Sequence, residues 1–350
     1  MAGDIDRRIV DGDVDCILAA NLPWSAFDGA TVVIAGAAGF LPAYMVEVLL
    51  RRNETAGAQT RVVALVRNPD AARWRFRRQM DRGALSIERQ DLGQALAYAG
   101  PADFIVHAAS QASPKHYGGD PVGTALPNAI GTAHLLDLAR AQACRGALFF
   151  SSAEVYGAAT ADPIHEAAFG PLDPTAIRSC YAESKRLGEA LCVAHAHQHG
   201  VPAKIARPFH CYGPGMKLDD GRVFADFVAA AVQGRNIRLH GTGSARRAFC
   251  YISDATLAFF TILLRGQAGL AYNVGNPDAE ISIRDLAKIV VGLSPTKGLS
   301  VETDGGVADG YIKSGAASAT PDVSRLTELG WAPGIGLKAG FERTIRAYLS

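Results

Sequence analysis

The feature that most constrains this chain is an apolar strand that runs through a glycine-rich turn into a helix. Residues 31–35 read TVVIA, a run typical of a parallel strand buried on both faces, and the segment GAAGFLPAYMVEVLLRRN that follows has apolar residues at helical spacing. Further strand-like runs are RVVALVR, DFIVHAAS, GALFFSS and VPAKIARPF, with helices predicted among them over residues 127–143 and 181–199. This alternation predicts an α/β fold built on a doubly wound parallel sheet.

The pattern changes after Phe209. The elements predicted beyond it are a turn-rich segment HCYGPGMKLDDGR, a helix over 223–233, a short strand at 237–239, a helix over 255–264, a loop GYIKSGAASAT and a closing helix from Leu337. We therefore expect an N-terminal extension over residues 1–28, a first domain over 29–209 and a smaller α/β domain over 210–350, with the chain crossing between the two domains. Trp24 and Phe27 should hold the extension against the body.

Charge and composition exclude several classes of protein. The chain has 35 Lys and Arg against 34 Asp and Glu, so it lacks the basic excess of a nucleic-acid-binding domain. No run approaches the roughly 18 apolar residues of a membrane span, and the first residues lack the apolar core of a secretory signal. The six cysteines are scattered without metal-ligand spacing, which favours reduced thiols and no metal site. These features predict a cytoplasmic protein.

The glycine turn is the first candidate binding site. Gly36 and Gly39 stand between strand and helix, followed by Phe40 and Leu41. Glycine in this position lets the backbone approach a pyrophosphate, whose negative charge is favoured at a helix N-terminus. A plain tight turn would use the same residues, and the usual third glycine is replaced by Pro42, which the first turn of a helix accommodates. The position directly after a buried strand favours dinucleotide binding.

The ends of the next two strands bear on which dinucleotide would bind. A carboxylate for the adenosine ribose is usual after the second strand, but residues 65–68 read LVRN and no acid precedes Asp70. Arg67 would suit the 2′-phosphate of NADP, or would stack on adenine or face water. Asp91 and Leu92 would suit the adenine amino group, or would cap a loop. We predict NAD, with NADP as the alternative that Arg67 suggests.

The sharpest signal is a tyrosine and a lysine four residues apart, with a serine pair upstream. Tyr181 and Lys185 fall on one face of a predicted helix, where the ammonium would favour the phenolate and lower the phenol pKa. A phenol with a lowered pKa is a usable base near neutral pH. Ser152, at the end of GALFFSS, would hydrogen-bond the same substrate oxygen. Tyr-x-x-x-Lys alone also occurs as a surface pair, so the interpretation depends on the three residues together with the glycine turn.

These motifs carry a family resemblance. The chain resembles the extended short-chain dehydrogenase/reductase enzymes that act on nucleotide-activated sugars, from about Thr31 to the C-terminal helix. The shared segments are GAAGFLP, HAASQASP, SSAEVYG, YAESK, ARPFHCYGPGM, DDGRVFADF, GTGSARRAFCYISD and YNVGNPDAEISI. Within that family it is most similar to UDP-glucuronate decarboxylases. The resemblance implies a Rossmann-like sheet that binds the dinucleotide and a smaller C-terminal domain that binds the nucleotide sugar.

The resemblance also implies roles for individual residues. The implied cofactor contacts are Gly36, Gly39, Phe40, Leu41, Arg67, Asp91, Leu92, Ala108, Ala109, Tyr181 and Lys185. The implied catalytic residues are Tyr181, Lys185, Ser152, Glu154 and Arg247, with Ser152 orienting the C4 hydroxyl and Arg247 near the sugar carboxylate. The implied substrate contacts are Ser113, Arg207, Tyr212, Arg222 and Arg247. Glu154 would otherwise be a loop acid, and Arg247 a surface cation beside Arg246.

The implied reaction oxidises sugar C4 transiently. The resulting 4-ketone makes the C5 carboxylate a β-keto acid, which releases carbon dioxide before the hydride returns. Ala153 departs from the family, because the decarboxylases usually carry Ser there and dTDP-glucose 4,6-dehydratases usually carry Asp. A 4-epimerase is therefore the leading alternative and a 4,6-dehydratase is less favoured. A further hypothesis is an NADPH-dependent reductase, which Arg67 suggests. Another is a non-catalytic NAD(P)-binding module, which the presence of Tyr181, Lys185 and Ser152 disfavours.

The predicted helices over 127–143 and 181–199 are apolar on more than one face. The resemblance implies that they form a four-helix bundle between two subunits, which predicts a homodimer.

Overall fold

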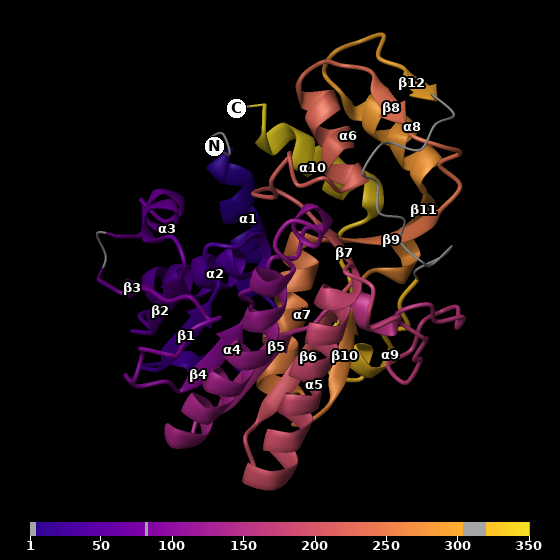
Figure 1. The fold of residues 1–350 in the computed structure, drawn as a ribbon. Coiled ribbons are helices and arrows are strands. Elements are labelled where there is room, and N and C mark those ends of the chain that lie inside the picture. The colour runs from indigo at the N-terminus through magenta and orange to yellow at the C-terminus, as the bar shows by residue number, and fades with distance from the viewer. Residues whose placement is uncertain (1–4, 81–82, 304–319, 350) are drawn as a thin grey trace.

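A seven-stranded sheet forms the centre of the computed structural model, which describes residues 5–80, 83–303 and 320–349 (Figure 1). Every neighbouring pair of its strands runs parallel. From one edge to the other the strands are β10 (Ala271–Val274), β6 (Ala203–Pro208), β5 (Gly146–Phe150), β4 (Phe104–His107), β1 (Thr31–Ala35), β2 (Arg61–Val66) and β3 (Leu85–Arg89). The chain starts in the middle and winds outward in both directions, which confirms the predicted doubly wound α/β fold.

Helices cover both faces of this sheet, as the continuous apolar strands predicted. Val32 and Ile34 of β1 pack on one face in the same core cluster as α1 (Arg7–Leu18), α2 (Phe40–Ala56) and α7 (Ile252–Arg265). On the other face, Val33 and Ala35 pack in a second cluster with α4 (Pro121–Ala141) and α5 (Ser179–His199). Alternate side chains of one strand therefore serve two cores. None of the helices described here combines the length and apolar character needed to cross a bilayer.

The N-terminal segment packs on the face that carries α2 and α7. After α1 it forms a short 3₁₀ helix, η1 (Trp24–Phe27). The Trp24 ring lies 5.1 Å from the Phe260 ring and the Phe27 ring 4.8 Å from the Phe104 ring, centroid to centroid, which confirms the predicted attachment. Asp13 of α1 is fully buried and fixes the helix further. It accepts hydrogen bonds from Arg343 and Tyr251 over 2.9 and 2.8 Å.

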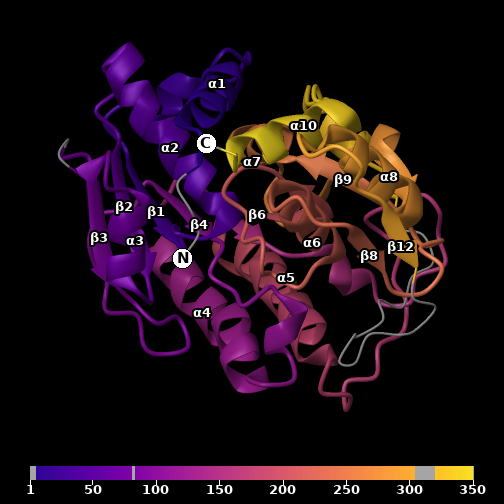
Figure 2. The same cartoon turned by 90° about the horizontal axis from the view of Figure 1, so that it is seen from above.

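The smaller part of the fold lies beyond the carboxyl ends of the central strands (Figure 2). It contains a three-stranded sheet of β11 (Glu280–Ser282), β9 (Arg246–Tyr251) and β7 (His210–Tyr212), and a two-stranded sheet of β12 (Val301–Thr303) and β8 (Ile237–Leu239). Its helices are α6 (Val223–Val232), α8 (Ile283–Leu293) and α10 (Leu337–Ala347). The chain returns to the central sheet through α7, β10 and the short α9 (Ser324–Thr327), which packs beside β10.

Two predicted helix starts are wrong. The helix predicted over 255–264 is α7, which begins at Ile252. The helix predicted over 127–143 is α4, which begins at Pro121, so that Pro127 lies inside it. Proline is common in the first turn of a helix, which made Pro127 resemble a start signal. The start is instead set by Asp120, whose side chain accepts a hydrogen bond from the Gly123 N–H. The remaining short helices are α3 (Pro69–Arg75), η3 (Pro114–His116), η4 (Ala153–Tyr156) and η5 (Pro277–Ala279). Nearly all of the predicted loop GYIKSGAASAT lies outside the described residues.

Candidate active site

The glycine turn after β1 brings two neighbouring strand ends into contact. Gly36 has a φ of +78°, in the left-handed region that favours glycine. A Cβ atom at Gly36 would lie 2.6 Å from Ala109 Cα and 2.9 Å from the Ala108 carbonyl carbon. Gly39 occupies the N-cap of α2 and, having no side chain, leaves the first backbone N–H groups of the helix, beginning at Phe40, for an anion. The turn therefore fits the pyrophosphate of a dinucleotide.

Replacing Gly36 with Ala should weaken dinucleotide binding by about 10- to 100-fold. The new Cβ would meet the Ala109 backbone and sit at a strained φ, at a cost of about 1–3 kcal/mol that only a shifted turn relieves. Gly57→Ala is the matched control, because Gly57 at the other end of α2 also has positive φ but open space around it. Calorimetric titration with NAD measures both variants. Equal losses of affinity would show that the contact with Ala109 is irrelevant to binding.

The other predicted cofactor residues lie at the same edge of the sheet. They are Leu41 in the first turn of α2, Arg67 after β2, Asp91 and Leu92 after β3, and Ala108 and Ala109 after β4. Arg67 is exposed and free to reach an adenosine group, whereas Leu92 is buried. The Asp91 carboxylate accepts a hydrogen bond from the Gly93 N–H over 2.9 Å. Asp91 therefore caps its own loop, which is one of the two roles predicted for it. The carboxyl ends of adjacent parallel strands thus form one continuous edge.

Tyr181, Lys185 and Ser152 come together beside this edge. Tyr181 and Lys185 lie in the first two turns of α5 and are almost fully buried. The Tyr181 ring stacks on Tyr117 with centroids 4.9 Å apart, and the nearby Ser152 side chain opposes the rise in the Tyr181 pKa. The Lys185 Nζ donates to the Phe150 carbonyl oxygen at the end of β5 and lies 5.8 Å from the Tyr181 ring centroid. Helix α5 and the end of β5 therefore bring the three residues together.

Burial, however, reverses one electrostatic prediction. The sequence predicts that Lys185 lowers the pKa of Tyr181, but removal of the phenol from water raises that pKa to about 12, although the Ser152 side chain acts in the opposite direction. Burial also lowers the pKa of Lys185 to about 7, so its ammonium is itself destabilised. The phenol is therefore protonated at neutral pH in this structure, and Tyr181 must gain stabilisation of its phenolate from the groups that bind beside it.

Glu154 is more than a loop acid, because it forms an ion pair at the entrance to the site. It lies in η4, directly after Ser152, whose Oγ accepts a hydrogen bond from the Glu154 N–H. Arg178 donates to both of its carboxylate oxygens, Nη1 to Oε2 over 3.1 Å and Nη2 to Oε1 over 3.5 Å. The negative charge of Glu154 also raises the pKa of Tyr181. Glu154 thus belongs to the same constellation as Tyr181.

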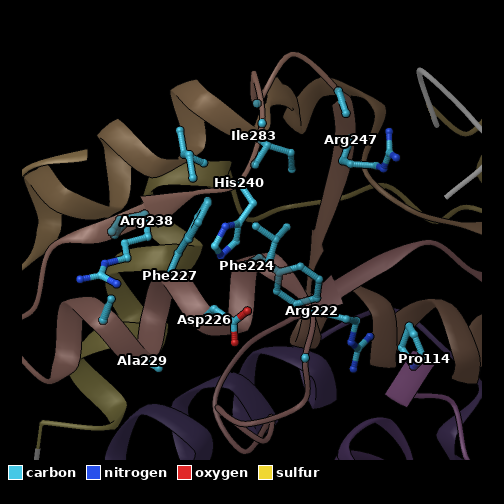
Figure 3. Close-up of a pocket in the computed structure, with 18 of the residues that line it drawn as sticks. Pro114, Arg222, Phe224, Asp226, Phe227, Ala229, Arg238, His240, Arg247 and Ile283 are labelled. Carbon is cyan, nitrogen blue, oxygen red and sulfur yellow. The ribbon is translucent and has the colours of Figure 1, made fainter. Parts of the chain in front are cut away.

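A cleft of about 1690 Å³ extends from Glu154 into the smaller part of the fold. Its lining includes the cations Lys115, Arg178, Arg222 and Arg247. Figure 3 shows Arg222 and Arg247 on one side of the view and Arg238 on the other, with Phe224, Phe227, Asp226 and His240 between them. Several cations beside an apolar wall suit a ligand that has phosphates and a flat ring. The cleft also confirms that Arg222 and Arg247 lie at a pocket rather than on the open surface.

Two predicted substrate residues have their side chains engaged inside the fold. Arg207 is buried and donates to the Glu189 carboxylate over 2.6 and 2.8 Å, as well as to the Tyr156 hydroxyl. Tyr212 is fully buried and stacks on Phe341 of α10 with centroids 4.1 Å apart. Neither lines the cleft. Arg207 therefore supports the walls of the site, and Tyr212 packs α10 against β7.

Ser113 has a more limited role than predicted in this structure. Its Oγ donates to the Asp220 carbonyl oxygen over 2.6 Å, and the adjacent Lys115 Nζ donates to the Asp219 carbonyl oxygen. Asp220 in turn pairs with Arg222. These contacts join the loop after β4 to the loop that precedes α6. Ser113 thus closes one side of the cleft instead of pointing a free hydroxyl into it.

The structure adds cleft residues that the sequence argument missed. They are Lys115, Arg178, His210, Asp226, Arg238 and His240. Burial of His210, together with the charges of Arg247 and Arg222, lowers its pKa to about 3, so its imidazole is neutral. Arg178 had a detectable signal, since it stands three residues before Tyr181 and so falls on the same side of α5. The others follow from tertiary contacts that no local pattern contains.

Comparisons with known proteins agree with this geometry. Residues 32–275 match the family model described as the NAD dependent epimerase/dehydratase family. UDP-glucuronic acid decarboxylase 3 of Arabidopsis thaliana is 32% identical over 313 residues, which cover 88% of this chain and 86% of that protein. UDP-glucuronic acid decarboxylase 1 of Xenopus tropicalis is 34% identical over 248 residues, which cover 70% of this chain and 56% of that protein.

Solved structures share the fold at lower identity. The UDP-glucose 4-epimerase of Thermotoga maritima gives a TM-score of 0.77 at 20% identity, over 91% of this chain and 98% of that one. The UDP-glucuronic acid 4-epimerase of Bacillus cereus gives a TM-score of 0.76, also at 20% identity and with the same coverage. With the family match over residues 32–275 and relatives above 30% identity, the chain belongs to the NAD dependent epimerase/dehydratase family.

Proposed function

We propose that this protein is a redox-neutral nucleotide-sugar enzyme that uses NAD to oxidise sugar C4 transiently and decarboxylates a UDP-glucuronate-like substrate. The observation that carries the proposal is the joining of two sites: Tyr181 and Lys185 are buried, and the cleft that begins at Glu154, whose N–H donates to Ser152, reaches Arg247. The names of the relatives support the same substrate, since they are UDP-glucuronic acid decarboxylases.

The residues supply proton transfer and charge in this scheme. When bound, NAD supplies hydride transfer in both directions, from sugar C4 and later back to it. Ser152 holds the C4 hydroxyl and Tyr181 takes its proton, while Lys185 stabilises the phenolate. Once C4 is a ketone, the bond from C5 to the carboxyl carbon breaks, carbon dioxide leaves, and the electron pair moves towards the C4 oxygen. C5 is then protonated, and Tyr181 returns its proton to the C4 oxygen when the alcohol reforms.

Positive side chains would hold the two ends of the substrate. Arg222 lies beside the loop that precedes α6, where it suits the diphosphate, and Arg247 suits the sugar carboxylate. In this assignment the positive side chains of the cleft bind the charged groups of the substrate, and Phe224 and Phe227 contact the nucleotide. Cations at two places in one cleft suit a substrate that carries both a diphosphate and a carboxylate.

The direct test is incubation of the NAD-loaded enzyme with UDP-glucuronate. We expect release of carbon dioxide and formation of a UDP-pentose without net consumption of nicotinamide. Formation of UDP-galacturonate alone would instead establish the 4-epimerase, the alternative that Ala153 favours. Stoichiometric consumption of NADPH would establish the reductase suggested by Arg67. Binding of UDP-glucuronate and NAD with no conversion would establish a non-catalytic module.

We also propose that the enzyme is a homodimer joined through α4 and α5. These helices lie side by side on one face of the sheet (Figure 1), yet both keep large apolar side chains exposed. The exposed fractions are 64% for Val122, 43% for Ile130, 49% for Leu187 and 46% for Val193. A second copy of the same helix pair would bury them in a four-helix bundle.

Replacing Leu187 with Glu should convert this dimer to a monomer. The dimer would bury the new carboxylate in an apolar interface without a partner. The free energy of desolvating it exceeds the binding free energy of a small interface. Light scattering coupled to gel filtration measures the mass. Leu349→Glu is the control, because Leu349 is 43% exposed but lies outside both helices. A wild-type monomer, or a dimer that survives Leu187→Glu, contradicts the four-helix interface.

Two organisational features complete the proposal. We assign cofactor binding to residues 29–209 and substrate binding to residues 210–350, with α7 and β10 returning to the first part and residues 1–28 as an extension. A cytoplasmic location fits the cysteines, since all six are free.

A further inference from the structure

Arg178 has no role in the proposed reaction, although it lines the cleft and pairs with Glu154. We propose that Arg178 is a positioning residue for Glu154 that also balances its charge, so that the cleft accepts a sugar that itself carries a carboxylate. This inference rests on the proposed function, because it matters only for an acidic sugar.

The ion pair joins the two segments that carry the catalytic residues. The segment after β5 carries Ser152 and Glu154, and the start of α5 carries Arg178 and Tyr181. Glu154 pairs with Arg178, and the Glu154 N–H donates to the Ser152 Oγ. The ion pair therefore ties the segment of Ser152 to the helix start that carries Tyr181, so that moving the Glu154 carboxylate would disturb the junction between them.

The side chain of Arg178 is committed to Glu154. Its two terminal nitrogens each donate to a different carboxylate oxygen, at 3.1 and 3.5 Å, and its Nε has no partner among the described residues. Arg178 also stands at the N-cap position of α5, where a positive charge opposes the helix dipole. A cation in this unfavourable place is explained by the anion that it faces.

The charge of the ligand explains why such a pair is needed. Glu154 and Arg178 both line the cleft, with 35% and 27% of their side chains exposed. A sugar carboxylate brought near an unpaired Glu154 would meet a like charge in a partly desolvated space. Arg178 removes that repulsion by pairing with Glu154.

The test compares two ligands that share a nucleotide and differ in sugar charge. UDP-glucuronate and UDP-glucose are titrated calorimetrically into the NAD-loaded enzyme and into Arg178→Met, which keeps the side chain's bulk without its charge. We expect Arg178→Met to weaken UDP-glucuronate binding by about tenfold and UDP-glucose binding by less than about threefold. Adding Glu154→Gln to Arg178→Met should bring UDP-glucuronate affinity back to within about threefold of Glu154→Gln alone.

The outcomes separate this role from two others. Equal losses of affinity for both ligands in Arg178→Met would show that Arg178 is only structural. Failure of Glu154→Gln to restore the affinity for UDP-glucuronate would show that Arg178 contacts the sugar carboxylate directly. Either result overturns the proposal. Arg178→Lys is the second variant, which keeps the charge and should show a smaller, still selective loss; a loss that is equal for both ligands overturns the proposal as well. If the wild-type enzyme binds UDP-glucuronate without decarboxylating it, the proposed function fails while the charge balance is still measured.

Discussion

Replacing Tyr181 with Phe should lower turnover of the nucleotide sugar by about 10²–10⁴-fold, the range that a positioned acid–base group contributes. The change removes one oxygen atom and keeps the ring that stacks on Tyr117, so the fold and the cofactor edge should persist. Without the phenol oxygen, no group at this position can take the proton that leaves the C4 hydroxyl. Steady-state turnover, together with NAD retained by the purified variant, measures the two effects separately.

Tyr98→Phe provides the matched control for this change. Tyr98 donates its hydroxyl to the Pro101 carbonyl oxygen over 2.7 Å, far from the site in the chain and outside the cleft. The same atom is removed, so a small loss of stability is expected and turnover should stay unchanged. Near-normal turnover of Tyr181→Phe would remove Tyr181 from the mechanism.

Replacing Lys185 with Met should abolish most turnover. The same change should raise the stability of the protein when stability is measured without added nucleotide at neutral or lower pH. Burial lowers the Lys185 pKa from 10.5 to about 7. Between these values the unfolded chain holds one more proton at Lys185 than the folded chain, so the stability of the wild type rises with pH across that window. Met does not titrate. The gain in free energy of unfolding of Lys185→Met over the wild type should therefore be largest below about pH 7. By about pH 9 this gain should be smaller by roughly 2 kcal/mol.

Urea unfolding at the two pH values measures this difference, and Lys204→Met is its control. Lys204 is also buried, also has a lowered pKa, and donates to the Leu263 carbonyl oxygen over 3.2 Å, but it lies in β6 away from the cleft. We expect a similar pH trend in stability and normal turnover. A Lys185→Met advantage that grows with pH would have the wrong sign for a buried ammonium.

The central sheet was predictable because its strands are continuous apolar runs. TVVIA in β1 and FIVH in β4 are buried at every position, and a parallel strand with both faces covered needs that composition. Helix starts were less predictable. Pro127 resembles a first-turn proline, whereas the start of α4 depends on the Asp120 side chain. The same pattern therefore fits two starts, and only the capping contact distinguishes them.

Within the site, residues fixed by local geometry were predictable and those fixed by distant partners were not. Gly36 follows from the strand-to-helix turn, and Tyr181 with Lys185 from one helix face. Tyr212 and Arg207 lie in a motif that resembles the family's, but their partners come from α10 and α5, which a linear pattern does not reveal. The raised pKa of Tyr181 is of the same kind, because burial is a property of the whole fold.

The most direct test of the central claim follows a deuterium atom placed at C4 of UDP-glucuronate. If C4 is oxidised and reduced again by the same bound nicotinamide, the label should be recovered at C4 of the UDP-pentose, since the hydride never leaves the site. Mass spectrometry and NMR of the purified product locate it. A label lost to water, or found only in nicotinamide released to solution, would contradict transient oxidation at C4.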